Sequence, residues 1–516
     1  MKKKFSLFAK SFFAITATTA IVGTTATTLA SCSSKQKQDV NKVVQAHFNN
    51  FLLNTHGRWT GNISNYGIDN IELDSSGRHI GVKSNAKPLY DLSTSIESSV
   101  NNYGSHHAYL YIVEQLKNMG YQNLTSNVQY PTNAKIEETT GTNGTDKVVT
   151  VKPQDGSKLV QISTTRSVMI SSNTSTTNLT KTGIMVQPFL WNGPDRASGA
   201  SMTYNNLAQN IVATIANNNA KNDFYIVAHY DSTVSGPNKS SWGATDNATG
   251  VAVALAIADY FIKNPEELQT TRLHIMFSDA EEVGVLGSYA FVEQYLTSNA
   301  SPTLNNIGMI NLDTVAGGDY IYVHSPNTDP KLGTVTGNSS SIIRDQINAL
   351  SRIRAVNHND PNLELLIHPQ ISAGEYRAGE TGDWSDHAPF YRKANIPVAY
   401  LESTNFQVKS NSGLYDGYSQ TKNLNAFVLK DGSTLASKKV SLKETSINNS
   451  QLKVYDLPDA EGMNSYGNYL VSGNIWHSDL DTLSWVKQNI GSNIYSQLTT
   501  MFESLKLYLQ TSLSSL

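Results

Sequence analysis

The chain has 516 residues, enough for one large domain or two ordinary ones with a sizeable hydrophobic core. Its formal net charge is −3 and only 16% of its residues are charged, so it lacks the basic stripe typical of nucleic-acid binding, and we expect no nucleic-acid partner. A single cysteine excludes an intrachain disulfide, so core burial or bound metal must stabilise the fold.

The first 32 residues differ in character from the rest. Lys2, Lys3 and Lys4 give a positive start, an apolar stretch rich in Thr and Ala follows, and Cys32 comes directly after Leu-Ala-Ser. Residues 1–31 therefore have the layout of a secretory signal, which is excluded from fold reasoning. The small residues before the cysteine resemble a bacterial lipoprotein signal. That resemblance implies cleavage before Cys32 and lipidation of its thiol and amine.

On this prediction, the mature protein lies on the extracellular face of the cell membrane, held there by its lipid anchor at Cys32. The alternative is a plain transmembrane anchor, since the apolar segment is nearly long enough to span a bilayer. Residues 32–90 are expected to form a tether and an N-terminal extension with a helix near 40–53. Residues 91–516 are expected to form the main domain.

The middle of the chain alternates apolar segments of strand length with apolar segments of helix length. Such alternation predicts an α/β fold, here a three-layer α/β/α sandwich with a mostly parallel mixed central sheet. The first two strands of this region are expected to be neighbours. Strands are predicted at 210–216, 223–230, 272–279, 306–315 and 397–404, and helices at 105–121, 250–264, 286–296 and 492–513.

Polar side chains stand at the ends of several of these strands, where ligands gather in open α/β sheets. His229, Glu281 and Asp313 fall at or just past such ends. Imidazole and carboxylate groups without a thiol suit zinc or another first-row divalent ion. Several carboxylates in one cleft repel each other unless cations are present, so two divalent ions would resolve the conflict. The candidate set is His229, Asp246, Glu281, Glu282, Asp313 and His477.

Several sequence blocks resemble, in the same order, the zinc aminopeptidase family typified by bacterial leucyl aminopeptidases. That family shares its scaffold with glutaminyl cyclases and glutamate carboxypeptidases. The similarity spans roughly residues 90–516. The blocks are AHYDS, GATDNATGVA, DAEEVGVLGS, NLDT, SDHAPF and HSDLDT.

The resemblance implies a site for two zinc ions. Asp246 would bridge both ions, and Glu281 would act as the general base. One ion would be completed by His229 and Asp313, and the other by Glu282 and His477.

Three further residues are implied to support these ligands. Asp231 would accept a hydrogen bond from the second ring nitrogen of His229 and so fix its tautomer. Asp386 and His387 would lie behind the ligands or face the substrate, or would form a buried structural pair.

The chain also departs from the family pattern. Thr245 stands where many members have a second acidic residue before the bridging aspartate, and Thr314 stands where methionine is common. Residues 405–475 are longer than the usual connection, and this insertion could roof the cleft or be peripheral.

These observations predict an exported, membrane-anchored metalloaminopeptidase that removes N-terminal residues from peptides, using water held between two zinc ions. One alternative is a glutaminyl-peptide cyclase on the same scaffold, and a carboxypeptidase-like specificity is also open. A third is a non-catalytic peptide-binding surface lipoprotein, although such a receptor has no need for Glu281 beside Glu282. Side-chain preference and oligomeric state are left open.

Overall fold

The computed structural model describes most of the chain from Ser34 to Leu513, and the predicted signal at 1–31 and Cys32 lie outside the described residues. The described residues are 34–55, 58, 71–73, 79–82, 105–124, 135–140, 147–152, 156–163, 166–172, 176–192, 206–233, 241–297, 304–326, 337–338, 340–367, 383–409, 419–446 and 453–513.

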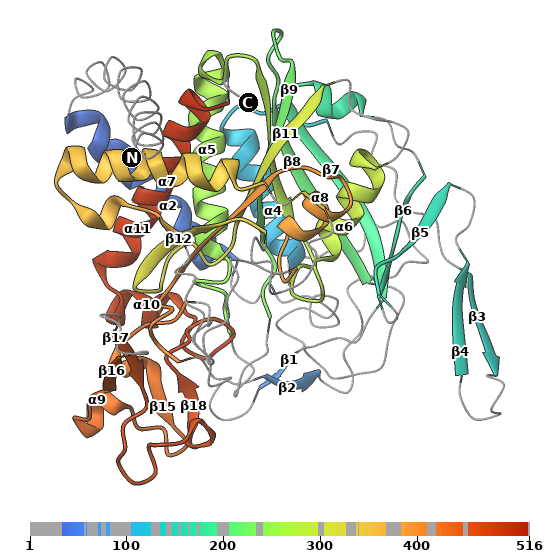
Figure 1. Cartoon of the computed structure of the whole chain (residues 1–516). Helices are drawn as coiled ribbons and strands as arrows, with labels where there is room; N and C mark the ends of the chain where they lie inside the picture. The colour runs from blue at the N-terminus through green and yellow to red at the C-terminus, as the bar shows by residue number, and fades with distance from the viewer. Residues whose placement is uncertain are drawn as a thin grey trace, which may run out of the picture.

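A ten-stranded mixed sheet forms the centre of the molecule (Figure 1), with the strand order β13-β12-β14-β11-β9-β10-β8-β7-β6-β5. Its strands are β5 (Ser157–Gln161), β6 (Ser167–Ser171), β7 (Gly183–Asn192), β8 (Asn206–Ile215), β9 (Asn222–His229), β10 (Thr271–Ser278), β11 (Asn305–Leu312), β12 (Tyr320–His324), β13 (Leu366–Ile367) and β14 (Val398–Thr404).

The predicted α/β fold with a mixed central sheet is confirmed, but parallel pairing is confined to part of the sheet. Strand β9 pairs in parallel with β10 and β11, β11 with β14, and β12 with β13. Strands β5 to β8 form an antiparallel meander, so the sheet is not parallel for most of its width. The expectation that β8 and β9 are neighbours is wrong, because β10 inserts between them and pairs with both.

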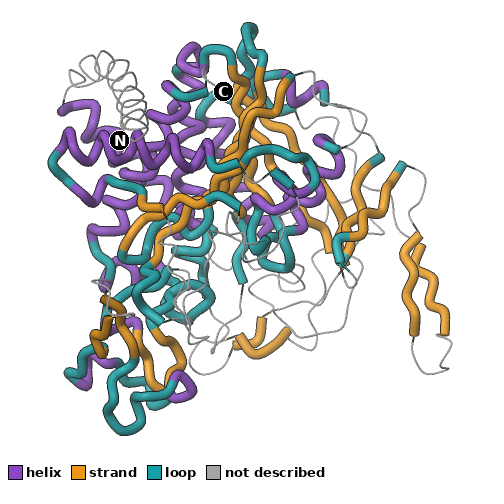
Figure 2. The backbone as a smooth tube through the Cα atoms, in the orientation of Figure 1, coloured by secondary structure: helices purple, strands orange, loops and turns teal. Residues whose placement is uncertain are grey.

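Helices cover both faces of this sheet, as Figure 2 shows. The helices of the described residues are α2 (Ser34–Asn54), α4 (Ser105–Asn118), α5 (Ala248–Lys263), α6 (Leu286–Phe291), α7 (Ile342–His358), α8 (His387–Arg392), α9 (Leu435–Lys438), α10 (Leu483–Asn489) and α11 (Ser492–Thr511), and α9 lies beside β15 instead of on the central sheet. Short helical turns are η4 (Thr177–Thr180), η5 (Pro265–Leu268), η6 (Val292–Leu296), η8 (Pro361–Leu363), η9 (Leu424–Ala426) and η10 (Tyr466–Asn468).

Alternate residues of β9 belong to different hydrophobic clusters, which establishes the three layers. Phe224 and Ile226 pack with residues of α2, α4, α5, α7 and α11. Tyr225 and Val227 pack instead with residues of α6, η6 and α8. Since successive strand side chains point to opposite faces, β9 is buried on both sides and reads as a continuous apolar run. The predicted sandwich is confirmed.

Helix α5 is apolar around most of its circumference because it is enclosed by protein. Twelve of its sixteen residues are buried, and it packs between the sheet and helices α2 and α11. A helix that is hydrophobic all round is stable only in such surroundings. Its buried position holds the residues just before Ala248 against the centre of the sheet.

The predicted insertion at 405–475 contains two small sheets outside the central one, drawn in orange and red at the lower left of Figure 1. Strand β15 (Phe427–Leu429) pairs with β18 (Tyr469–Ser472), and β16 (Lys443–Ser446) pairs with β17 (Lys453–Asp456). These elements share a hydrophobic cluster of their own, separate from the sheet's clusters. The end of β18 leads within a few residues to His477.

Two hairpins complete the described elements. Strand β1 (Ile71–Leu73) pairs with β2 (His79–Val82), and β3 (Lys135–Thr140) pairs with β4 (Lys147–Lys152). Among the helices in the described part of the chain, none has an apolar stretch long enough to cross a bilayer.

The start of β9 is held by a buried charge network. The Asp223 carboxylate accepts hydrogen bonds from Arg272 Nε at 2.7 Å and Nη2 at 2.8 Å, and it lies 2.9 Å from His274 Nε2. Burial by itself raises the pKa of Asp223, but the bonds from His274 and Arg272 outweigh burial and lower it below its usual value. Asp223 therefore favours the folded state while it is charged.

We expect Asp223→Asn to lower the free energy of unfolding at pH 7 by about 3–5 kcal/mol, because it leaves the buried Arg272 without its counter-charge. The ionised Asp223 carboxylate contributes fully to the free energy of unfolding at pH values above its pKa in the unfolded chain, which is near 4. This contribution is lost as the pH falls through the lower pKa of Asp223 in the folded protein. The deficit, measured by urea denaturation, should therefore shrink in acid. Glu444→Gln, which breaks the exposed pair with Lys453, is the matched control and should change stability little. Equal effects of the two substitutions would contradict this account.

Candidate metal centre

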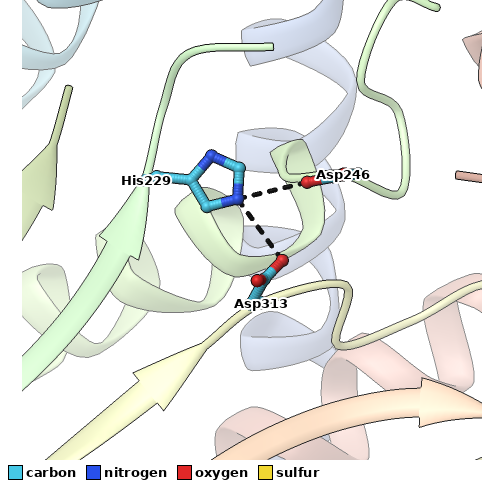
Figure 3. A group of neighbouring side chains, drawn as sticks. All are labelled: His229, Asp246 and Asp313. Carbon is cyan, nitrogen blue, oxygen red and sulfur yellow. Dashed lines mark hydrogen bonds and ion pairs between the residues drawn. The ribbon is translucent and has the colours of Figure 1, made fainter. Parts of the chain in front are cut away.

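Three predicted site residues meet at the end of β9 (Figure 3). His229 Nε2 lies 3.1 Å from Asp246 Oδ1 and 3.3 Å from Asp313 Oδ1. All three side chains are buried and offer ligand atoms within 4.8 Å of one another. They come from the ends of two adjacent strands and from the segment that leads into α5.

A second group meets on the other side of Asp246. His477 Nε2 lies 3.0 Å from Asp246 Oδ2 and 2.9 Å from Glu282 Oε2. These atoms too lie within 4.8 Å of one another. Asp246 therefore directs one carboxylate oxygen to each histidine, which is the arrangement expected of a bridging ligand.

The sheet topology explains why these residues meet. Strand β9 lies between β10 and β11, and all three run in parallel, so their carboxyl ends share one edge of the sheet. His229 ends β9, Asp313 follows β11, and Glu282 lies shortly after β10. Side chains at a common edge of parallel strands converge by geometry alone.

Asp231 holds the Glu281–Glu282 segment against β9. Its two carboxylate oxygens accept the backbone N–H groups of Glu281 and Glu282, each at 3.2 Å. The expected bond to His229 differs in detail. Nδ1 of the imidazole lies 3.3 Å from the Asp231 backbone oxygen and 3.6 Å from its carboxylate, so the carbonyl is the closer partner.

Asn247 fastens Asp246 to the end of β11, a role the sequence analysis missed. Its side-chain oxygen accepts the N–H groups of Gly250 at 2.9 Å and Thr314 at 3.2 Å, while Nδ2 donates to the Leu312 carbonyl at 2.7 Å. Asparagine directly before a helix is an N-cap signature, so the signal for this role was present in the sequence.

Gly250 allows this close approach of α5 to β11. A Cβ atom there would lie 2.4 Å from both the Leu312 backbone oxygen and the Asn247 side-chain oxygen. The first turn of α5 can thus lie directly against the strand end that precedes Asp313.

Ser385 orients Asp313 and was also missed. Its hydroxyl donates to Asp313 Oδ2 at 2.7 Å and accepts from Asn311 Nδ2 at 2.7 Å. Asn311 Nδ2 also lies 3.4 Å from His387 Nδ1, which connects His387 to the same chain of polar contacts. This chain leaves Asp313 Oδ1 directed at His229.

Asp386 and His387 are both fully buried. Asp386 accepts hydrogen bonds from Ser278 at the end of β10 and from Ser288 in α6. Asp386 therefore ties α8 to the strand and helix that flank Glu281.

The electrostatics of the centre reflect crowded carboxylates. Burial raises the pKa of Glu281 well above its usual value, and the charges of Asp313 and Asp386 raise it further while His229 opposes them. Burial and the Asp246 charge likewise raise the pKa of Glu282. Each carboxylate disfavours ionisation of the next, a conflict that cations relieve.

Backbone strain is also present at this site. Ala280, Thr314 and His477 have φ values of 57°, 51° and 53°, in the left-handed region that residues with a Cβ avoid. Each residue is itself a candidate ligand or is adjacent to a site residue. Such strain persists where surrounding structure fixes the backbone, and it gathers at functional sites.

The donor set fits zinc. Each histidine nitrogen faces two carboxylate oxygens, although one ring nitrogen carries at most one proton. Ligand atoms bonded to a tetrahedral zinc at about 2.0–2.2 Å lie about 3.3 Å from one another, close to the observed separations. Glu282 Oε1 is buried and has no hydrogen-bond partner within the described residues, which leaves it available to a cation.

The sequence also places the chain in a family. The model of Peptidase family M28 matches residues 210–490, more than half of the chain, and all six predicted site residues lie within that range. The chain belongs to peptidase family M28.

Individual relatives match shorter stretches. The chain is 26% identical over 205 residues to a glutamate carboxypeptidase 2 homolog of Caenorhabditis briggsae, covering 39% of this chain and 24% of the relative. It is 28% identical over 207 residues to a probable zinc metalloprotease of Pyrenophora tritici-repentis, covering 37% and 45%. Among solved structures, BSAP, a zinc aminopeptidase from Bacillus subtilis, is 19% identical with a TM-score of 0.33, covering 60% of this chain and 51% of that one. The chain thus spans less than half the length of these two sequence relatives.

Proposed function

We propose that this peptidase is a zinc-dependent aminopeptidase, which hydrolyses the N-terminal residue from peptides at a centre for two ions. The observation that carries the proposal is the placement of Asp246. One of its oxygens lies beside His229 and the other beside His477, and each histidine has a second carboxylate partner. The name of the fungal relative, a probable zinc metalloprotease, supports the choice of metal.

Each residue would have a distinct part in holding zinc. His229 and Asp313 would hold one ion, Glu282 and His477 the other, and Asp246 both. Zinc bound there would supply a Lewis acid for the substrate carbonyl and would lower the pKa of a coordinated water to about 7.

Glu281 would act as the general base. It belongs to neither group of candidate ligands, yet the next residue is one. Asp231 fixes the backbone N–H groups of both Glu281 and Glu282, and the carboxylate of Glu282 faces His477, so Glu281 is held at its backbone directly beside a candidate ligand. In this position Glu281 would take a proton from the attacking water and return it to the departing amine.

We expect Glu281→Gln to lower kcat for aminoacyl-nitroanilide hydrolysis by about 10²–10⁴-fold, because it removes the base but keeps the shape of the side chain. Bound zinc, measured by mass spectrometry of the metal, should stay at the level of the unsubstituted protein. Glu266→Gln, outside the site in η5, is the control and should leave both quantities unchanged. Undiminished hydrolysis by the Glu281→Gln protein would rule out this assignment.

Two alternatives predict different products and a different zinc content. A glutaminyl-peptide cyclase would release ammonia from peptides that begin with glutamine and would work with one zinc. A peptide-binding lipoprotein would bind zinc and peptides without turnover of any substrate. The complete second group, with His477, Glu282 and a shared Asp246, favours the hydrolase that uses two ions.

The location of the protein is a separate part of the proposal. The Leu-Ala-Ser-Cys sequence at 29–32 supports export and lipid attachment at Cys32. A lipid anchor would place the peptidase on the extracellular face of the cell membrane, where peptide substrates from the surroundings would be accessible.

We expect Cys32→Ala to abolish labelling by radioactive palmitate and to leave a larger, uncleaved precursor when the full chain is expressed in bacteria. Ser33→Ala is the neighbouring control and should be labelled and processed normally. Membrane retention at unchanged size in both variants, with no label in either, would instead identify a plain transmembrane anchor.

A further inference from the structure

Arg58 is a buried cation that comes from outside the family match. It belongs to the predicted N-terminal extension, yet its side chain is fully buried beside the metal centre. Nη1 donates to the Trp242 carbonyl at 2.9 Å and Nη2 donates to the Gly243 carbonyl at 2.5 Å. Both carbonyls belong to the loop 241–247 that carries Asp246.

Arg58 is fixed on two further sides. Its guanidinium lies over the ring of Phe51 in α2, 4.8 Å from the centroid. Its backbone oxygen accepts the N–H of Ser232 at 3.0 Å, which joins it to the segment just past His229 and Asp231. Helix α2, the end of β9 and the loop 241–247 therefore share this one residue.

Asp481 holds the same loop by accepting hydrogen bonds from its N–H and hydroxyl groups, whereas Arg58 donates to its carbonyls. Its Oδ1 accepts the Thr245 N–H at 2.5 Å and the Thr245 hydroxyl at 2.8 Å, and its Oδ2 accepts the Asp246 N–H at 3.3 Å. Its backbone oxygen accepts the N–H groups of Trp242 and Ala244. Arg58 thus binds two carbonyls of the loop, and the carboxylate and backbone oxygens of Asp481 bind four of its N–H groups.

The loop 241–247 is packed closely against Arg58, so its backbone has little room to move. Gly243 has a φ of 67°, and a Cβ there would lie 2.4 Å from the Asp246 backbone oxygen and 2.6 Å from Arg58 Nη2. Asp481 also follows His477 by four residues, so the contacts that fix Asp246 fix the segment carrying the second histidine.

We propose that Arg58 and Asp481 are a pair of positioning residues that hold the loop 241–247, so that a residue of the N-terminal extension sets the zinc affinity of the centre. The inference rests on the proposed zinc site. Because Asp246 faces both groups of ligands, loosening this loop weakens both ion positions. Groups that orient metal ligands typically contribute 10–100-fold in metal affinity.

The test measures zinc dissociation constants of the purified full chain by competition with a chromophoric chelator. Arg58→Met should bind zinc about 10–100-fold more weakly. Arg58→Lys, which keeps the charge and can reach one carbonyl, should fall between this variant and the unsubstituted protein. Arg352→Met, at an exposed arginine paired with Glu364, is the control and should bind zinc normally.

A second pair of variants decides the matter if Arg58→Met does not fold. Thr245→Val removes the hydroxyl that donates to Asp481 but keeps the shape of the side chain, and it should weaken zinc binding several-fold. Thr245→Ser retains the hydroxyl and should bind within about twofold of the unsubstituted protein. The melting temperature without zinc is measured alongside, since a purely structural role would lower it without changing the affinity at a temperature where the protein is folded.

The outcomes separate this inference from the proposed function. Normal zinc affinity in folded Arg58→Met and Thr245→Val proteins would overturn the positioning role alone. If the unsubstituted chain binds no zinc, the proposed function and the inference both fail.

Discussion

Buried carboxylates that surround the same two imidazoles can remain charged only if their charge is balanced, and this constraint governs the architecture around Asp246. Asp246, Asp313 and Glu282 lie within about one hydrogen-bond length of His229 or His477. Two divalent ions would supply the missing positive charge. The surrounding structure then serves to hold these carboxylates together despite their repulsion.

The fold meets this requirement with rigid elements. Three parallel strands bring His229, Asp313 and the Glu281–Glu282 segment to one edge of the sheet, and the buried helix α5 holds Asp246 beside them. Separate polar contacts then hold separate parts of the centre. Asp231 holds the Glu281–Glu282 segment, Asn247 holds the backbone next to Asp246, and Ser385 holds Asp313. The insertion has its own small hydrophobic core and leads into the segment that carries His477.

Local sequence patterns predicted the elements of the centre better than their arrangement. The apolar runs identified β9, β10, β11 and α5 to within a few residues, because burial on both faces leaves a strong signal. The order β8, β10, β9 was not predicted, because the local sequence of a strand does not specify which distant strand pairs with it. His229 and Asp313 could be inferred from strand ends, whereas Asp246 and His477 required the order of whole motifs. Arg58 could not be inferred at all, because the sequence around it shows no regular pattern and the residue acts through main-chain carbonyls far along the chain.

Diffraction at the zinc absorption edge, from crystals grown with zinc, tests the central claim most directly. The account predicts two anomalous peaks about 3.5–4 Å apart, one between His229 and Asp313 and one between His477 and Glu282, with the Asp246 carboxylate between them. A map with no peak beside Asp246, or with only one, would contradict a centre for two ions.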